Sequence, residues 1–341
     1  MAITIADVAS RAGVSTATVS RVLAGVGSAR PDTRQRVLES ARELGYRPSG
    51  VARSLKLRTT RTLGLIITDI GNPFFPELVS AVEEAARERD YGVLLCNSGE
   101  DPEREGAYLE LLAERRVDGV VIASSGVGRR HRTWLAKAPL PVVLVNCASP
   151  GVPLPTILSD NRAGAALAIG HLIALGHRRI AHITAPSRNE AAAERLEGAR
   201  DALRAAGLDS AALLVAEGDG HVGGGAAAAE RLLETDPHLT AIFAYNDLTA
   251  IGAIRAIRGR GLRVPDDVSV VGFDDVDLAA FADPPLTTVA QATASMGRWA
   301  VAQLLDRLRG GPPTTETVML PVHLEIRSST AAPPAREAAV S

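Results

Sequence analysis

Beyond residue 61 the chain alternates between short apolar runs and stretches whose apolar residues recur at helical spacing. The apolar runs are rich in β-branched residues and apolar on both faces, which is the pattern of a parallel strand buried between helices. Nine runs fit this description, at residues 62–70, 91–97, 119–124, 141–146, 180–184, 213–216, 241–245, 268–273 and 288–291. The helical stretches between them have Gly or Pro near their ends, at residues 77–89, 103–116, 163–175, 192–206, 226–234 and 249–258.

Strands that alternate with helices predict doubly wound α/β sheets. Nine strands are more than one such sheet comfortably holds, so we expect two similar lobes. The break between the lobes is predicted near residues 160–162.

Residues 4–57 contain no strand pattern and predict a small helical unit. Thr4 can cap a first helix over Ile5–Ala12, which Gly13 ends, and Ser15 can cap a second helix that runs through residue 23. A third helix is predicted over residues 32–44. A small residue at 9, a turn glycine at 13 and an apolar residue at 14 indicate a helix-turn-helix, because two helices that cross closely need small residues at the contact.

The distribution of charge changes how the near-neutral composition is interpreted. The whole chain of 341 residues has a formal net charge of −2. Residues 1–61 hold 11 basic against 4 acidic residues, a balance of +7, while the other 280 hold 26 basic against 35 acidic residues, a balance of −9. A basic head on an acidic body predicts that the head binds nucleic acid.

Several other classes of protein do not fit the sequence. The chain has no apolar run near the roughly 18 to 20 residues of a membrane span. Asp7 and Arg11 interrupt the N-terminus before any apolar core forms, so it is not a secretory signal, and we expect a cytoplasmic protein without a membrane partner. Cys96 and Cys147 each end an apolar run and are expected to be buried thiols rather than a disulfide or a metal site.

The predicted second helix of the head carries residues suited to the DNA major groove, where the second helix of such a motif lies. It combines small polar residues with one arginine. Arg21 can bond guanine acceptors, and the methyl group of Ala17 can meet a thymine methyl. The candidate DNA contacts of the motif are Thr4, Ser15, Thr16, Ala17, Thr18, Ser20 and Arg21.

The run TIADVASRAGVSTATVSRVL at residues 4–23, with Tyr46-Arg-Pro and Val-Ala-Arg-Ser-Leu-Lys up to residue 56, closely resembles the lactose-repressor family of bacterial transcription regulators. The resemblance continues through DIGNPFFPEL (69–78), RRVDGVV (115–121), SDNRAGA (159–165), HLIALGHRRIA (171–181), YNDLTAIGA (245–253), GLRVPDDVSVVGFDD (261–275) and PPLTTVAQATASMG (284–297). It implies an all-α helix-turn-helix DNA-binding head and an α/β periplasmic-binding-protein-like core of two doubly wound lobes.

The same resemblance implies domain limits. The head is expected at residues 1–48, a hinge helix and linker at 49–61, the core at 62–330 and a flexible tail at 331–341. Within the core, the N-lobe is expected at about 62–161 plus 293–320, and the C-lobe at about 162–290 plus 321–330.

The hinge helix maps to residues 49–56, where Ala52, Leu55 and Lys56 match DNA-contacting positions. Leu55 falls on the position that wedges into the central minor groove in the family. The alternative, that Leu55 packs on the core, stays open. A segment this short does not stay helical alone, so its folding can be coupled to DNA binding.

The family places its effector contacts in the cleft between the lobes. Most matching positions fall at the carboxyl ends of strands, where open α/β sheets bind ligands. Arg195 opposite Asp274 would supply donors and acceptors that suit vicinal hydroxyls, whereas Asn246 and Asp247 could instead cap the following helix. The matching residues are Phe74, Phe75, Ser124, Asn146, Asp160, Arg195, Asn246, Asp247, Phe273 and Asp274.

Two positions depart from the family. Family members usually have an aromatic ring after the Gly-Asp at 218–219, where it stacks on the effector, and here Gly220 takes its place with His221 beside it. Ala24 replaces the usual asparagine at the end of the recognition helix, which loosens the turn without abolishing docking.

No catalytic constellation stands out in the sequence. Residues 218–223 match G-x-G-x-x-G, but the glycines continue to Gly225 and no second strand ends in an acid at the required distance. His171 and His177 lie six residues apart, which does not place two metal ligands on one helix face. We therefore expect no enzyme, cofactor or metal.

The sequence predicts a homodimeric transcriptional regulator, a repressor, that binds double-stranded operator DNA as an inverted repeat. A sugar or sugar derivative, as inducer of a carbohydrate-utilisation operon, is the first expectation for the small-molecule effector. A nucleobase corepressor is the alternative within the family, and a solute-binding protein with the same core is the alternative from another class.

Overall fold

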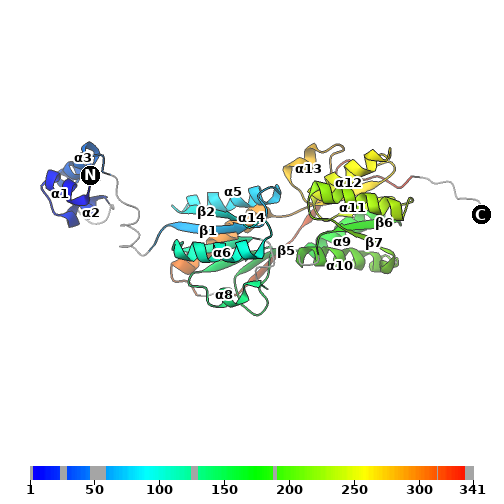
Figure 1. Ribbon diagram of the computed structural model, residues 1–341, viewed down its shortest axis with the longest axis horizontal. Coiled ribbons are helices and arrows are strands. Elements are labelled where there is room, and N and C mark those ends of the chain that lie inside the picture. The colour runs from blue at the N-terminus through cyan, green and yellow to red at the C-terminus, as the bar shows by residue number, and fades with distance from the viewer. Residues whose placement is uncertain are drawn as a thin grey trace, which may run out of the picture. The chain divides into compact units, whose positions relative to one another are not determined.

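The computed structural model describes residues 3–23, 29–46, 59–123, 130–186, 190–312 and 314–334. The chain divides into two compact units, Met1–Arg61 and Thr62–Ser341 (Figure 1). Among the described residues, no helix is both long enough and apolar enough to cross a membrane.

The first unit, the head, packs three helices around a small core. They are α1 (Ile5–Ala12), α2 (Thr16–Leu23) and α3 (Pro31–Glu43). Thr4 and Asp7 form a capping box at the start of α1, and Gly13 ends the helix in the left-handed region at φ 66°. The core of the head consists of Val8, Ala9, Ala12, Val19, Val22, Val37 and Ala41.

The first lobe of the second unit contains a six-stranded sheet in the order β11-β5-β4-β3-β1-β2. Figure 1 shows α5 and α14 on one side of this sheet and α6 and α8 on the other. Leu65 and Ile67 of β1 pack toward α5 and α14, whereas the intervening Ile66 packs toward α6, because successive strand residues face opposite sides. The elements are β1 (Thr62–Ile67), α5 (Phe74–Arg87), β2 (Gly92–Asn97), α6 (Pro102–Glu114), β3 (Gly119–Ala123), α8 (Arg132–Ala136), β4 (Val142–Val145), β5 (Thr156–Ser159), α14 (Thr293–Leu308) and β11 (Thr317–Leu320).

The second lobe repeats the plan, with the strand order β12-β10-β9-β8-β6-β7. Helices α11 and α12 pack on one face of its sheet, and α9 and α10 on the other. Strand β12 runs antiparallel to β10, whereas the other neighbours in this sheet are parallel. The elements are α9 (Asn161–Ala174), β6 (Ile180–Thr184), α10 (Glu190–Ala205), the 3-10 turn η1 (Ser210–Ala212), β7 (Leu214–Glu217), α11 (Val222–Thr235), β8 (Ala241–Ala244), α12 (Asp247–Gly259), β9 (Ser269–Asp274), α13 (Asp277–Phe281), β10 (Thr287–Ala290) and β12 (His323–Glu325).

The chain passes from one lobe to the other three times. The crossings follow β5 at residues 160–161, follow β10 at residues 291–292, and lie between β11 and β12 at residues 321–322. Helix α14 and strand β11 therefore belong to the first lobe although they come late in the chain. These crossings place the side chains at residues 159–161 and 291 between the two sheets.

The predicted two-lobed α/β core is confirmed, and each of the nine predicted runs overlaps a strand. The pattern missed β5, β11 and β12. The expectation that every strand is buried on both faces was wrong for β2, where Leu94 and Leu95 are exposed, and for β7, where Val215 is exposed, because both are edge strands that helices cover incompletely. Cys96 and Cys147 are both buried thiols, and neither forms a disulfide.

Candidate functional site

The exposed side of α2 carries the candidate DNA contacts of the head. Val19 and Val22 are buried in the head core. Because the opposite side of the helix faces outward, Thr16, Ala17 and Arg21 are exposed. The helix therefore presents two small side chains and one long cation, a combination that can approach base edges closely.

Local hydrogen bonds order the first turn of α2. The backbone N–H of Thr18 donates to Ser15 Oγ at 3.2 Å, so Ser15 acts as the predicted cap. Arg21 Nε donates to the carbonyl oxygen of Ala17 at 3.3 Å, which keeps the guanidinium along the helix surface. Thr18 and Ser20 are half-buried. The predicted DNA contacts Ala52, Leu55 and Lys56, and also Ala24, lie outside the described residues.

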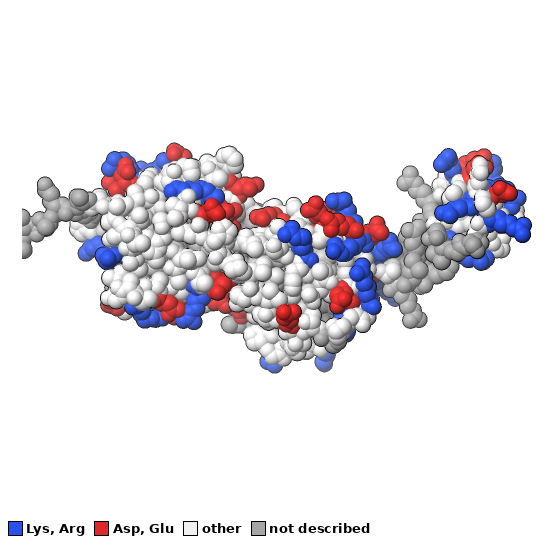
Figure 2. Space-filling model, turned by 180° about the vertical axis from the view of Figure 1, so that it is seen from behind, with Lys and Arg blue, Asp and Glu red and all other residues white. Residues whose placement is uncertain are grey.

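The described surface of the head is rich in arginine. Figure 2 shows Lys and Arg side chains spread over the visible face of this unit, with fewer acidic ones among them. Arg11 is paired with Glu43, which ties α1 to α3. The other arginines of the described head are Arg21, Arg30, Arg34, Arg36, Arg42 and Arg61.

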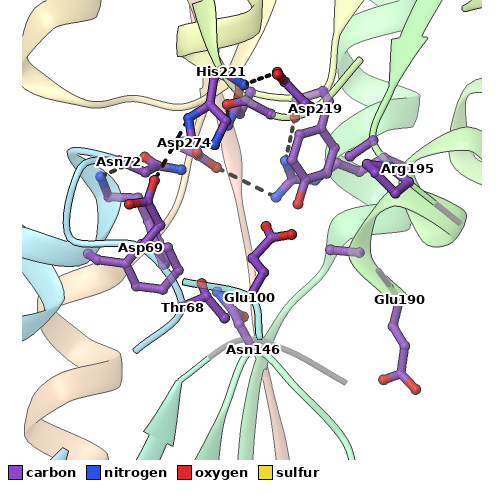
Figure 3. Close-up of a pocket in the computed structure, with 18 of the residues that line it drawn as sticks. Thr68, Asp69, Asn72, Glu100, Asn146, Glu190, Arg195, Asp219, His221 and Asp274 are labelled. Carbon is purple, nitrogen blue, oxygen red and sulfur yellow. Dashed lines mark hydrogen bonds and ion pairs between the residues drawn. The ribbon is translucent and has the colours of Figure 1, made fainter. Parts of the chain in front are cut away.

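A cavity of about 1090 Å³, including the part open to solvent, lies in the second unit between the carboxyl ends of its two sheets. Figure 3 shows side chains from both lobes turned toward it. The lining combines polar residues with three aromatic residues. It consists of Thr68, Asp69, Asn72, Phe74, Phe75, Glu100, Glu105, Arg130, Asn146, Asn161, Ala185, Pro186, Glu190, Ala191, Arg195, Asp219, Gly220, His221, Tyr245, Asn246, Asp274 and Gln291.

A chain of hydrogen bonds runs across the cavity floor from one lobe to the other. Asn146 Nδ2 donates to Gln291 Oε1 at 3.1 Å, and Ser159 Oγ donates to the same oxygen at 2.5 Å. Gln291 Nε2 in turn donates to Asp274 Oδ1 at 2.7 Å. Because Gln291 lies on a crossing between the lobes, it couples the strand ends of the first lobe to Asp274 of the second.

Asn146 and Asp274 both have backbone conformations that residues other than glycine rarely adopt. Their φ angles are 50° and 114°. Such conformations persist only where the surrounding structure holds them, and they cluster at binding sites. Here they turn both polar side chains from the strand ends into the cavity.

Arg195 and Asp274 form the buried polar centre of the cavity. Arg195 Nη2 lies 3.5 Å from Asp274 Oδ1, and the two side chains are only 5% and 7% exposed. The guanidinium carbon lies 3.5 Å from the centroid of the Phe273 ring and 4.7 Å from that of Tyr245. Its Nε donates to Asn161 Oδ1 at 2.9 Å, and its Nη1 donates to the carbonyl oxygen of Tyr245.

Burial dominates the titration of Asp274. It raises the pKa of this carboxyl to about 6, although the charge of Arg195 and the hydrogen bond from Gln291 oppose the rise. Burial and the nearby Asp274 carboxylate also raise the pKa of Asp247. The Asp274 carboxyl, with a pKa of about 6, can therefore change charge close to neutral pH.

The cavity brings together six of the predicted effector contacts, namely Phe74, Phe75, Asn146, Arg195, Asn246 and Asp274. Three others, Asp160, Phe273 and Asp247, are not among its lining residues. Asp160 caps α9 by accepting from the Ala163 N–H at 2.9 Å, and Phe273 lies behind Arg195. Ser124 lies outside the described residues.

Asp247 stabilises the fold and does not line the cavity. Its Oδ2 accepts from the Val276 N–H at 2.9 Å, and its Oδ1 accepts from Thr288 Oγ1 at 2.5 Å. The side chain therefore holds the ends of β9 and β10 beside α12. Asn246 has two tasks, since it caps α12 through the Thr249 N–H and also lines the cavity.

Sequence reasoning missed several lining residues. Thr68 and Asp69 directly follow β1, Tyr245 follows β8 and Gln291 follows β10. The rule that ligands bind at strand ends could have found them, because each lies near the end of a predicted run. Glu100 and Glu190 follow no such rule, and only the fold brings them to the cavity.

His221 of the second lobe faces Asp69 of the first across the mouth of the cavity (Figure 3). His221 Nδ1 lies 3.8 Å from Asp69 Oδ2. Gly220, with φ 83°, lies next to the Tyr245 ring. Because position 220 has no aromatic side chain, the half-buried ring of Tyr245 supplies an aromatic face on that side of the cavity.

A helix-turn-helix head and a two-lobed α/β core with a polar cavity between its lobes define a class, the ligand-responsive DNA-binding regulators. Residues 4–49 match the family described as "Bacterial regulatory proteins, lacI family". Residues 60–326 match "Periplasmic binding proteins and sugar binding domain of LacI family". The chain belongs to the LacI family, and it is a DNA-binding transcriptional regulator with an effector-binding core.

Individual relatives support this assignment. The chain is 38% identical over 307 residues to the HTH-type transcriptional repressor PurR of Aliivibrio salmonicida, covering 90% of this chain and 92% of the relative. It is 37% identical to a solved complex of the transcriptional regulator CelR with cellobiose, with a TM-score of 0.73 and coverage of 96% and 99%. The lac repressor dimer bound to operator and the anti-inducer ONPF is 29% identical, with a TM-score of 0.88 and coverage of 97% and 100%.

Proposed function

We propose that this protein represses a carbohydrate-utilisation operon and that a sugar bound in the core cavity controls its affinity for the operator. The observation that carries the proposal is the buried pair of Arg195 and Asp274, facing a cavity built from both lobes. A guanidinium beside a carboxylate offers donors and acceptors to neighbouring hydroxyls of one ring. The relative CelR was solved with cellobiose, which supports a sugar as the ligand class.

The head is proposed to read the operator through α2, with Arg21 at the base edges and Ser15 and Thr16 toward phosphates. A relative, the lac repressor, was solved as a dimer on its operator. A two-fold symmetric dimer places two heads on an inverted repeat with half-sites about one helical turn apart. Such a protein acts where the chromosome lies, so we propose a cytoplasmic regulator rather than an enzyme.

Exposed apolar side chains of the core support a homodimer. Phe281 is 85% exposed and Leu278 of the same short helix, α13, is 49% exposed. Leu94 and Leu95 are exposed on the edge strand β2. Large apolar side chains gathered on a surface mark places where another protein surface packs.

Control of DNA binding is proposed to pass through the lobe crossings. A sugar that contacts both lobes favours one relative arrangement of them. Gln291 lies on a crossing and bonds both Asn146 and Asp274, so occupation of the cavity changes the restraint on that crossing. In a dimer, the changed arrangement alters the spacing of the hinge segments and therefore the affinity for the operator.

The test is a thermal-shift screen of the full chain against neutral sugars and nucleobases, followed by operator binding with each stabilising compound. A sugar that stabilises the wild type but not Asp274→Ala, and that changes operator affinity, is the expected result. Asp266→Asn, which removes an exposed carboxylate paired with Arg263 outside the cavity, serves as the control. Stabilisation by nucleobases alone would show that the effector is a nucleobase rather than a sugar. A compound that stabilises the wild type and Asp274→Ala equally would show that it does not bind in the cavity.

A further inference from the structure

We infer that the core cavity selects against negatively charged ligands, so that the effector is an uncharged sugar without a phosphate or carboxylate group. The inference rests on the proposed function, because it concerns the ligand of the same cavity. It follows from three separate features of the described residues: the balance of charge on the cavity wall, the bonds already made by Arg195, and the side chains that cover the helix N-termini nearby.

The first feature is an excess of carboxyl groups on the wall. The described lining has six acidic residues against two arginines. The six are Asp69, Glu100, Glu105, Glu190, Asp219 and Asp274. In Figure 3 the carboxylate of Glu100 points into the space between Asn146 and Asp274, from the side opposite Asp219. A ligand phosphate would therefore be surrounded by like charge in a partly desolvated space, where repulsion is strong.

The second feature is that Arg195 already has hydrogen-bond and ion-pair partners within the protein. It donates to Asn161 Oδ1 and to the Tyr245 carbonyl oxygen, and its third nitrogen lies beside Asp274. Aromatic rings lie against its plane, and the side chain is buried. Because a guanidinium carries five N–H donors, these contacts leave some of them for a ligand. A phosphate that accepted from them would lie beside the Asp274 carboxylate with no proton to donate to it. Hydroxyl groups, in contrast, can accept from its edge and donate to Asp274 at the same time.

The third feature concerns helix N-termini, which bind phosphate in many α/β proteins through their exposed N–H groups. At the start of α11 the His221 N–H donates to Asp219 Oδ1 at 2.9 Å. At α12 the Thr249 N–H donates to Asn246 Oδ1 at 2.9 Å, and at α5 the Phe74 N–H donates to Asn72 Oδ1 at 3.1 Å.

At α12 and α5 the protein's own side chains thus accept from N–H groups that a phosphate would need. The N-cap residue of α11, His221, makes no side-chain cap, but the Asp219 carboxylate lies beside the first turn, so close to Gly224 that a Cβ there would overlap it. This glycine-rich turn is the segment that matches G-x-G-x-x-G in the sequence. A carboxylate in this turn would repel a dinucleotide phosphate.

The two remaining basic groups on the wall do not reverse the balance. His221 faces the carboxylate of Asp69 at 3.8 Å. Arg130 is exposed, so solvent and salt screen its charge. The wall as a whole therefore favours a ligand that donates hydrogen bonds and carries no negative charge.

The test compares matched pairs of ligands by isothermal titration calorimetry on the full chain at low ionic strength. The pairs are D-ribose with D-ribose 5-phosphate and D-glucose with D-glucose 6-phosphate, extended by cellobiose. At least one neutral sugar should bind, and its phosphorylated partner should bind at least tenfold more weakly. A phosphorylated sugar that binds as tightly as its neutral partner, or more tightly, would overturn the inference.

A double variant, Glu100→Gln with Asp219→Asn, separates charge from shape. It keeps both side chains nearly isosteric and removes two negative charges, so the ratio of affinities within a pair should narrow at least threefold. Glu316→Gln, an exposed change outside the cavity, should leave that ratio unchanged. A ratio that stays constant in the double variant would contradict the role of these carboxylates.

The outcomes also separate this inference from the proposed function. If a sugar phosphate binds more tightly than the neutral sugar and changes operator affinity, the regulator is ligand-controlled as proposed but the inference is wrong. If neither neutral nor phosphorylated sugars bind, both the inference and the sugar-responsive function are overturned.

Discussion

The raised pKa of Asp274 predicts that sugar binding weakens in mild acid. Burial raises the pKa of this carboxyl to about 6, and only the ionised form accepts hydrogen bonds from sugar hydroxyls with both oxygens. Below that pKa a proton competes with the ligand. One group with a pKa near 6 loses about tenfold of its ionised fraction between pH 7 and pH 5, so the association constant should fall about tenfold, or about 1.4 kcal/mol.

The sign of this effect differs between binding and folding. Affinity rises with pH through about 6 and levels off above 7, because binding requires the carboxylate. Folding stability has the opposite dependence. The folded protein holds this proton more tightly than an unfolded chain whose carboxyl has the ordinary value of 3.8, so the contribution of Asp274 to stability falls as pH rises from about 4 to about 6.

The assay is calorimetric titration with an uncharged sugar at several pH values between 5 and 8, since such a ligand does not itself titrate. Asp274→Asn cannot ionise and should bind weakly with no pH dependence between 5 and 7 beyond what histidines contribute. Asp266→Asn removes an exposed carboxylate paired with Arg263 and should keep the wild-type profile. A wild-type profile that is flat, or a slope that persists in Asp274→Asn, would refute the reasoning.

Three further predictions concern the head, the hinge and the core. Arg21→Ala should reduce discrimination at one base pair of the operator by about 1–3 kcal/mol in competition with single-base variants, and an equal loss on all duplexes would show that Arg21 contacts only phosphate. Leu55→Gly should weaken specific operator binding while sugar affinity measured by calorimetry stays unchanged. An unaltered operator affinity would contradict the insertion of Leu55 into the minor groove. Gly198→Ala should lower the free energy of unfolding by about 2 kcal/mol in urea, because its Cβ would overlap the carbonyl oxygen of Arg162 where α9 meets α10. Gly170→Ala, with open space around it, is the matched control, and an equal effect of both changes would contradict this close approach.

The strands that were predictable from the sequence are those buried in the sheet interiors. Runs such as those containing β3 and β9 are apolar at every position because helices cover both faces. Strands β11 and β12 are short and partly exposed, with Met319 among the exposed side chains, so they lack a continuous apolar run. Their pairing depends on the last crossing between the lobes, which local pattern does not encode.

The cavity was predictable only in part, for a related reason. The strand-end rule finds Asn146 and Asp274, but it cannot separate a side chain that lines the cavity from one that stabilises the fold. Asp160 and Asp247 also follow or adjoin strands, yet one caps a helix and the other holds β9 and β10. Gln291 acquires its place because three distant segments meet at one crossing, so its partners are visible only in three dimensions.

The central claim is that a ligand in the core cavity changes the affinity of the head for DNA. Its most direct test is fluorescence anisotropy of a labelled operator, selected from random duplexes with the purified full chain and titrated with and without the tightest-binding sugar. We expect the sugar to change the operator Kd of the wild type at least fivefold and that of Asp274→Ala not at all. Without the sugar, the two proteins should bind the operator with equal affinity. A sugar that binds the wild-type core yet leaves operator Kd unchanged would contradict it.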